Sequence, residues 1–89
     1  MPINPIGKEE LTEEQKVARH ISAMGDSVTV INEAIEKGDH SENAHKRIEA
    51  NVSHLELMIG KDMIANSGQD LTAFTAAIAA GKSFIAAAN

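Results

Sequence analysis

The sequence predicts an all-α protein: a three-helix bundle made of a long antiparallel helical hairpin, an alanine-rich third helix and an extended N-terminal arm. Three observations predict this fold class. Apolar residues recur at alternating steps of three and four along most of the chain, which places them on one helix face. Capping patterns precede three such segments, and glycine-containing breaks separate them.

The arm is predicted over residues 1–11. Pro2 and Pro5 disfavour helical geometry in their neighbours, and Gly7 adds backbone freedom. The segment has no basic region followed by an apolar run, so we expect no secretory signal. Residues 12–89 are expected to form a single helical domain, because 89 residues suffice for one small domain.

The first helix is predicted over residues 12–37. Thr12 and Gln15 form a capping-box pattern, in which a hydroxyl caps the helix and the Gln side chain reaches back. Gly38 stands where a left-handed C-terminal cap belongs. Between them, six apolar residues form a narrow seam at steps of 4, 3, 4, 3 and 4: Val17, Ile21, Met24, Val28, Ile31 and Ile35.

Residues 25–32 leave an alternative open within this helix. They combine Gly25 with a run of β-branched residues that could alternate as a strand. The apolar seam passes through the stretch without a break. We therefore favour a helix with a kink at Gly25 over a strand.

The second helix is predicted over residues 39–59, with Asp39 and Glu42 as its capping pattern. Gly60 ends it, unless the chain continues for one more turn through Ile64. The short link around Gly38 makes the first two helices an antiparallel hairpin. The apolar face of the second helix consists of Ala44, Ile48, Val52, Leu55 and Ile59.

The third helix is predicted over residues 69–87, after an Asn-Ser-Gly break at 66–68. Ser67 and Asp70 fit a capping pattern at its start. Its apolar seam is Leu71, Phe74, Ile78, Gly81 and Ile85. Together the three seams predict a core of Val17, Ile21, Met24, Val28, Ile31, Ile35, Ile48, Val52, Leu55, Ile59, Leu71, Phe74, Ile78 and Ile85.

The opposite face of the third helix is small and nearly uncharged: Thr72, Thr75, Ala76, Ala79, Ser83 and Ala86. A helix on the flank of a bundle normally shows a polar face to water. Alanine at an exposed position favours the helix, so a neutral exterior is one interpretation. We favour the other interpretation, in which a helix of another copy or of another protein packs on this face. The residues that we expect to take part in contacts with another molecule are Leu71, Phe74, Ile78, Gly81, Phe84 and Ile85.

The composition disfavours several classes of function. The formal net charge is −5, from 13 acidic and 8 basic residues, and Tyr and Trp are absent. A nucleic-acid partner is not expected, because such proteins carry basic surfaces and often aromatic stacking platforms. The apolar stretch 71–88 is interrupted by polar residues, so no membrane span is expected. The absence of cysteine excludes disulfides.

Motifs for chemistry are weak, and we predict no catalytic, cofactor-binding or metal-binding residues. Gly81-Lys82-Ser83 matches the end of a phosphate-binding loop but lies within a predicted helix. Glu42, His45 and Glu49 could share one helix face as metal ligands, although i,i+4 charge pairs explain the pattern more simply. No serine has an evident base partner or a nucleophile-elbow sequence.

The sequence thus predicts a non-enzymatic structural, assembly or adaptor protein that acts through helix–helix contacts with itself or with a protein partner. A small capsid- or tail-associated protein of a phage virion would have this size and character. The alternative is a small cytoplasmic regulator that binds one protein partner. A metal-binding helical bundle is third. We expect a cytoplasmic location, or the virion if the chain is phage-encoded.

Overall fold

Helix α1 (Glu13–Lys37) begins and ends where its capping residues predict. The computed structural model describes residues 11–88, so most of the predicted arm lies outside the described residues. The Thr12 hydroxyl accepts the N–H of Gln15 at 3.1 Å, and the Thr12 N–H donates to Gln15 Oε1 at 2.8 Å. Gly38 closes the helix with a φ of 65°. Residues 25–32 are helical throughout, which excludes the strand alternative.

Helix α2 (Glu42–Ile59) begins three residues later than predicted. The Asp39 carboxylate accepts the N–H of Ser41 at 2.8 Å and thereby shapes the turn, so it does not cap the helix. Ser41 is the cap, and its hydroxyl accepts the N–H of Ala44 at 3.2 Å. After Gly60 the chain does not continue α2. It forms a separate short helix, α3 (Asp62–Ala65).

Helix α4 (Thr72–Ala87) also begins three residues later than predicted. The Ser67 hydroxyl donates to the carbonyl of Ile64 at 2.7 Å and accepts the N–H of Gln69, so it belongs to the α3–α4 loop. Asp70 accepts the N–H of Thr72 at 2.9 Å. Leu71 occupies the N-cap position without a side-chain cap. The predicted capping box is therefore wrong.

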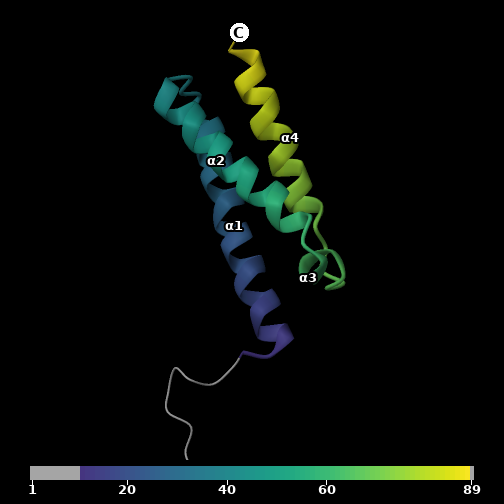
Figure 1. Ribbon diagram of the computed structural model, residues 1–89. Coiled ribbons are helices and arrows are strands. Elements are labelled where there is room, and N and C mark those ends of the chain that lie inside the picture. The colour runs from purple at the N-terminus through teal and green to yellow at the C-terminus, as the bar shows by residue number, and fades with distance from the viewer. Residues whose placement is uncertain (1–10, 89) are drawn as a thin grey trace, which may run out of the picture.

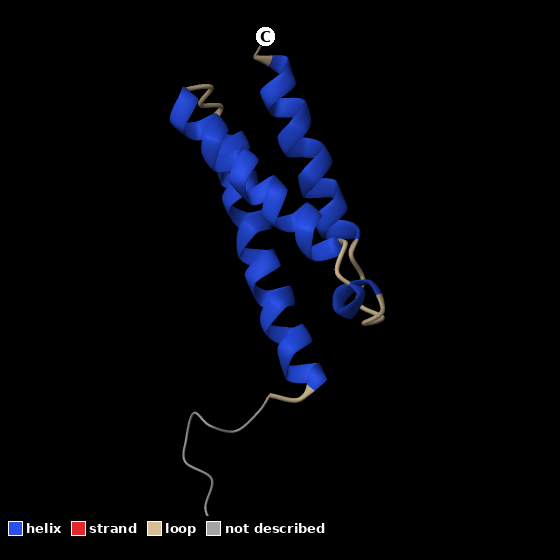
Figure 2. Cartoon of the chain, in the orientation of Figure 1, coloured by secondary structure: helices blue, strands red, loops and turns tan. Residues whose placement is uncertain are grey.

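The described residues form an all-α bundle with four helices and no strand (Figures 1 and 2). Helices α1 and α2 make the predicted antiparallel hairpin, and α4 packs on both of them. Short α3 lies in the connection between α2 and α4 and contacts both helices of the hairpin. The predicted three-helix bundle is confirmed, with α3 as an addition.

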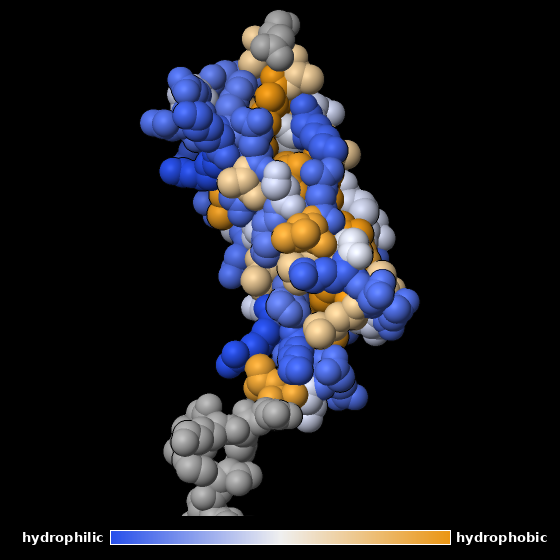
Figure 3. Space-filling model, viewed as in Figure 1, coloured by the Kyte–Doolittle hydropathy of each residue, from blue (hydrophilic) through white to orange (hydrophobic). Residues whose placement is uncertain are grey.

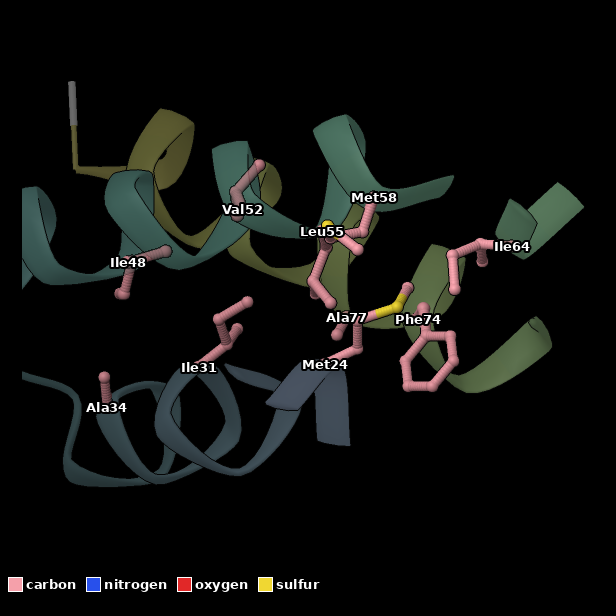
Figure 4. Packing of buried hydrophobic residues seen from close by; sticks show 10 residues of the cluster. All are labelled: Met24, Ile31, Ala34, Ile48, Val52, Leu55, Met58, Ile64, Phe74 and Ala77. Carbon is pink, nitrogen blue, oxygen red and sulfur yellow. The ribbon is translucent and has the colours of Figure 1, made fainter. Parts of the chain in front are cut away.

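The core lies between the three long helices. Figure 4 shows its side chains in a row that runs from Ala34 and Ile48 at one end to Phe74 and Ile64 at the other. Of the predicted core residues, six are buried and the other eight are partly buried and pack against them. Four buried hydrophobic residues are not in the predicted core, namely Ala34, Met58, Ile64 and Ala77. Three of these flank the predicted seams, and Ile64 is buried because α3 folds back onto the hairpin.

Gly81 sets the distance between α4 and the hairpin. A Cβ atom at this position would lie 2.8 Å from Val52 Cγ2 and 3.0 Å from Ile48 Cγ2. Such distances are closer than normal carbon contacts of about 3.5–4.0 Å. The α4 backbone therefore rests directly on two core side chains of α2.

Candidate interaction surface

Of the six residues predicted to contact another molecule, five lie on the inner face of α4 and Leu71 is its N-cap residue. Phe74 and Gly81 are buried against the hairpin. The other four, Leu71, Ile78, Phe84 and Ile85, are partly buried and pack against the core. Phe74 and Gly81 thus contribute no surface to a partner in this structure. An intermolecular role for the other four stays a prediction.

The exposed side of α4 is small and almost uncharged. Ten of its sixteen residues are exposed, and they comprise six alanines, three hydroxyl residues and Lys82. Opposite the inner face, five of the ten lie at steps of 4, 3, 4 and 3, which aligns them along the helix. We call these residues the outer seam: Thr72, Ala76, Ala79, Ser83 and Ala86.

The exposed sides of α1 and α2 differ from the outer seam in charge. Both carry acidic and basic residues on many exposed turns, among them Glu14, Glu33 and Glu49. On α4 the ammonium group of Lys82 lies 2.7 Å from a carboxylate oxygen of Glu56 on α2. Figure 3 shows one face of the molecule, on which hydrophobic residues appear in separate patches between hydrophilic ones. The outer seam is therefore a neutral strip on an otherwise charged molecule.

Ser27 and His54 form a polar pair between α1 and α2 that the sequence did not reveal. The Ser27 hydroxyl lies 2.7 Å from Nδ1 of His54, and Ser27 is 5% exposed. The expectation that no serine has a base partner is wrong for Ser27, because the two residues are 27 positions apart and meet only after folding. A buried serine has no room for a substrate. The pair satisfies two polar groups in the interior.

A second unpredicted cluster joins the α1–α2 turn to α4. Nδ1 of His40 lies 2.9 Å from Nε2 of His45. The His40 ring also stacks on Phe84, with centroids 4.0 Å apart and an interplanar angle of 12°. Asp39, beside the cluster, has a lowered pKa, chiefly because Ser41 donates hydrogen bonds to its carboxylate and to a smaller extent because His40 or His45, when protonated, attracts it.

Glu42, His45 and Glu49, which the sequence offered as a less favoured alternative set of metal ligands, do not form a ligand cluster. Glu42 pairs with Lys46 at 2.9 Å, and His45 faces His40. Among residues 11–88, no group of three or more potential ligands is arranged to hold a metal ion. Two imidazoles alone fall short of the three or four protein ligands of a typical zinc site. Gly81-Lys82-Ser83 lies inside α4 and forms no phosphate-binding loop.

An open groove of about 410 Å³ runs between α2 and α4. It is lined by Glu49, Val52, Ser53, Glu56, Lys82, Ile85 and Ala86. Glu56 and Lys82 are already paired with each other, and no histidine lines the groove to act as a base for Ser53.

No protein-family model, curated protein or solved structure matches this chain. Within residues 11–88, no helix combines the length and the hydropathy that crossing a membrane requires. What the chain does must therefore be inferred from its own surfaces.

Proposed function

We propose that the chain is a non-enzymatic structural or adaptor protein that acts through helix–helix contacts, and that the outer seam of α4 packs against a second copy of the chain. One observation carries the proposal: small, uncharged side chains are exposed at regular helical spacing along a long helix that has no acidic residue.

Small side chains favour close packing of helices. The distance between two helix axes, about 8–10 Å, depends on the side chains at the contact, and small residues allow the lower end of that range. In the outer seam no side chain is larger than threonine. A second helix could therefore approach the α4 backbone closely and bury the surface between them without losing the conformational freedom of long side chains.

If the partner is a second copy, the charge distribution favours the outer seam over the other faces as the place of contact. With a net charge of −5, two copies repel each other over most orientations. Contact through α1 or α2 would bring their exposed carboxylates together. Contact through the outer seam avoids this repulsion, because the nearest charge, Lys82, already pairs with Glu56.

The test is the molar mass in solution, measured by light scattering over about a hundredfold range of concentration. Ala79→Glu places a carboxylate in the middle of the outer seam. Ala50→Glu makes the same change at an exposed position of α2 and serves as the matched control. We expect the wild type and Ala50→Glu to form the same oligomer, and Ala79→Glu to be a folded monomer by circular dichroism.

Two results would contradict the proposal. A wild-type monomer at every concentration would show that the outer seam does not bind a second copy, which leaves a different protein as its partner. An Ala79→Glu variant that retains the oligomer would place the contact elsewhere. The biological setting stays open in this proposal. The outer seam could bind a neighbour in a virion or another large assembly, or the one partner of a regulatory protein.

A further inference from the structure

The α1–α2 turn and the C-terminal end of α4 meet at one end of the bundle (Figure 1). Three aromatic rings join them: His40 in the turn, His45 in the first turns of α2, and Phe84 in α4. Each ring contacts the other two. His45 lies edge-on to His40, with centroids 5.1 Å apart, and edge-on to Phe84 at 5.9 Å. His40 stacks on Phe84 and shares a hydrogen bond with His45.

From this geometry we propose that His40, His45 and Phe84 form a pH-dependent latch, which holds the last turns of α4 on the hairpin at neutral pH and releases them when both histidines are protonated. The latch is a property of the single chain and does not depend on the proposed association.

The last turns of α4 have few other attachments. After Gly81, the residues that pack on the hairpin are Phe84 and Ile85, both partly buried. The ion pair of Lys82 with Glu56 is exposed, and such pairs contribute little to stability. Ala86, Ala87 and Ala88 are exposed. Loss of the Phe84 contact would therefore leave this end of α4 weakly held.

Protonation acts on the hydrogen bond between the two imidazoles. A neutral imidazole has one N–H and one acceptor nitrogen, whereas a protonated imidazole has two N–H groups and no acceptor. The bond at 2.9 Å needs a donor on one ring and an acceptor on the other. It persists when neither ring or one ring is protonated. When both are protonated, two N–H groups and two positive charges face each other, and the rings must separate.

The surrounding charges do not remove this conflict. Lys37 ends α1, Lys46 on α2 pairs with Glu42, and Lys82 is the charged residue of α4. Asp39 lies beside the latch, and Glu42 and Glu49 lie about one turn before and one turn after His45 on α2. These carboxylates supply no acceptor between the two N–H groups. Because histidines change charge between about pH 5 and 8, release is expected as the pH falls through that range.

The two phenylalanines of the chain make the latch measurable. Ring-labelled Phe gives signals from Phe74, which is buried in the core, and from Phe84. We expect the Phe84 ring signals to move toward those of a solvent-exposed ring between about pH 7.5 and pH 5, while those of Phe74 stay unchanged. Amide protection of residues 84–87, corrected for intrinsic exchange, should fall about tenfold over the same range.

His45→Gln and His20→Gln are the test variant and its control. Glutamine retains hydrogen-bonding groups but takes up no proton, so His45→Gln should keep Phe84 stacked at pH 5. His20, a partly buried histidine of α1, lies outside the cluster, and its replacement should leave the response intact. Repeating the titration with Ala79→Glu separates the latch from any association. A Phe84 signal that does not move, or one that moves equally in His45→Gln, would overturn the proposal.

Discussion

The α1–α2 hairpin and helix α4 are held in place by different means. Both hairpin helices start at a hydroxyl cap, and α1 ends at a left-handed glycine. Their exposed positions carry most of the charges of the chain. Helix α4 begins without a side-chain cap and carries one charged residue. Its position is fixed by Phe74, Ala77 and Gly81, which are buried against the hairpin.

This difference separates local from tertiary control of structure. The ends of α1 and α2 are defined by hydrogen bonds between residues close in sequence, which act whatever the rest of the chain does. Alanine gives α4 a high helix propensity, but propensity says nothing about where a helix packs. Changes to the inner face of α4 should therefore have larger effects than changes to its ends or to exposed positions.

Phe74→Ala, on the inner face of α4, should cause the largest loss of stability. Phe74 is 7% exposed and lies beside Met24 and Ile64 in the core (Figure 4). Removing a buried aromatic ring typically costs about 3–5 kcal/mol. Urea unfolding should show such a loss, and Leu57→Ala, at a residue that is 64% exposed, should change stability by less than about 0.5 kcal/mol. Similar losses in both variants would contradict the packing of α4.

The two helix-interior glycines should respond in opposite directions to alanine. At Gly25 an added Cβ meets nothing within 4 Å, so Gly25→Ala should stabilise the protein by about 0.5–1 kcal/mol through helix propensity. At Gly81 the Cβ would collide with Val52 and Ile48, whose β-branched side chains are stiff. Gly81→Ala should therefore cost about 1–2 kcal/mol overall. The free energies of unfolding of both variants test this prediction. Stabilisation by Gly81→Ala would show that α4 packs less closely on the hairpin than the structure indicates.

Ser27→Ala tests the polar contact within the hairpin. The variant leaves Nδ1 of His54 without its partner in a partly buried site, which should cost about 1 kcal/mol. Ser22→Ala, at an exposed position of the same helix, is the matched control. Chemical denaturation should show a loss in the first variant and none in the second. Equal stabilities would mean that the contact between Ser27 and His54 contributes nothing.

The smallest effect is expected at the start of α4. Hydrogen bonds from the Thr72 side chain and its backbone N–H lower the pKa of Asp70 below 3.8. A carboxyl group with a lowered pKa in the folded state adds stability above its unfolded pKa, and this contribution disappears as the pH falls through the folded value. The wild type should therefore be slightly more stable than Asp70→Asn at pH 6, and the difference should disappear as the pH falls below 3.8 and through the lowered pKa of Asp70. A difference that persists in acid would contradict this role.

Periodicity predicted much of the fold, because a 3–4 spacing selects one helix face. It identified six of the buried residues among its fourteen core positions, and the capping residues placed α1 within one residue. The starts of α2 and α4 were each predicted three residues too early. Asp39 accepts a hydrogen bond from Ser41, the N-cap of α2, and Asp70 accepts one from Thr72, the first residue of α4. A capping pattern alone does not distinguish these roles from that of a helix cap.

The candidate sites were less predictable than the fold. Two contacts join residues from different parts of the chain, namely Ser27 with His54 and His40 with Phe84. These residues meet only because the helices pack against one another. The sequence singled out both faces of α4 but assigned the intermolecular contact to the inner one. That face includes Phe74 and Gly81, which the hairpin covers.

The sequence by itself determined the helical class, the antiparallel hairpin and the neutral character of α4, because these follow from spacing, caps and composition within short stretches. The tertiary structure decided which face of α4 remains exposed, where α3 folds back, and which polar side chains meet between helices. Those features depend on distances between residues far apart in sequence, and such distances are set only when the helices pack against one another.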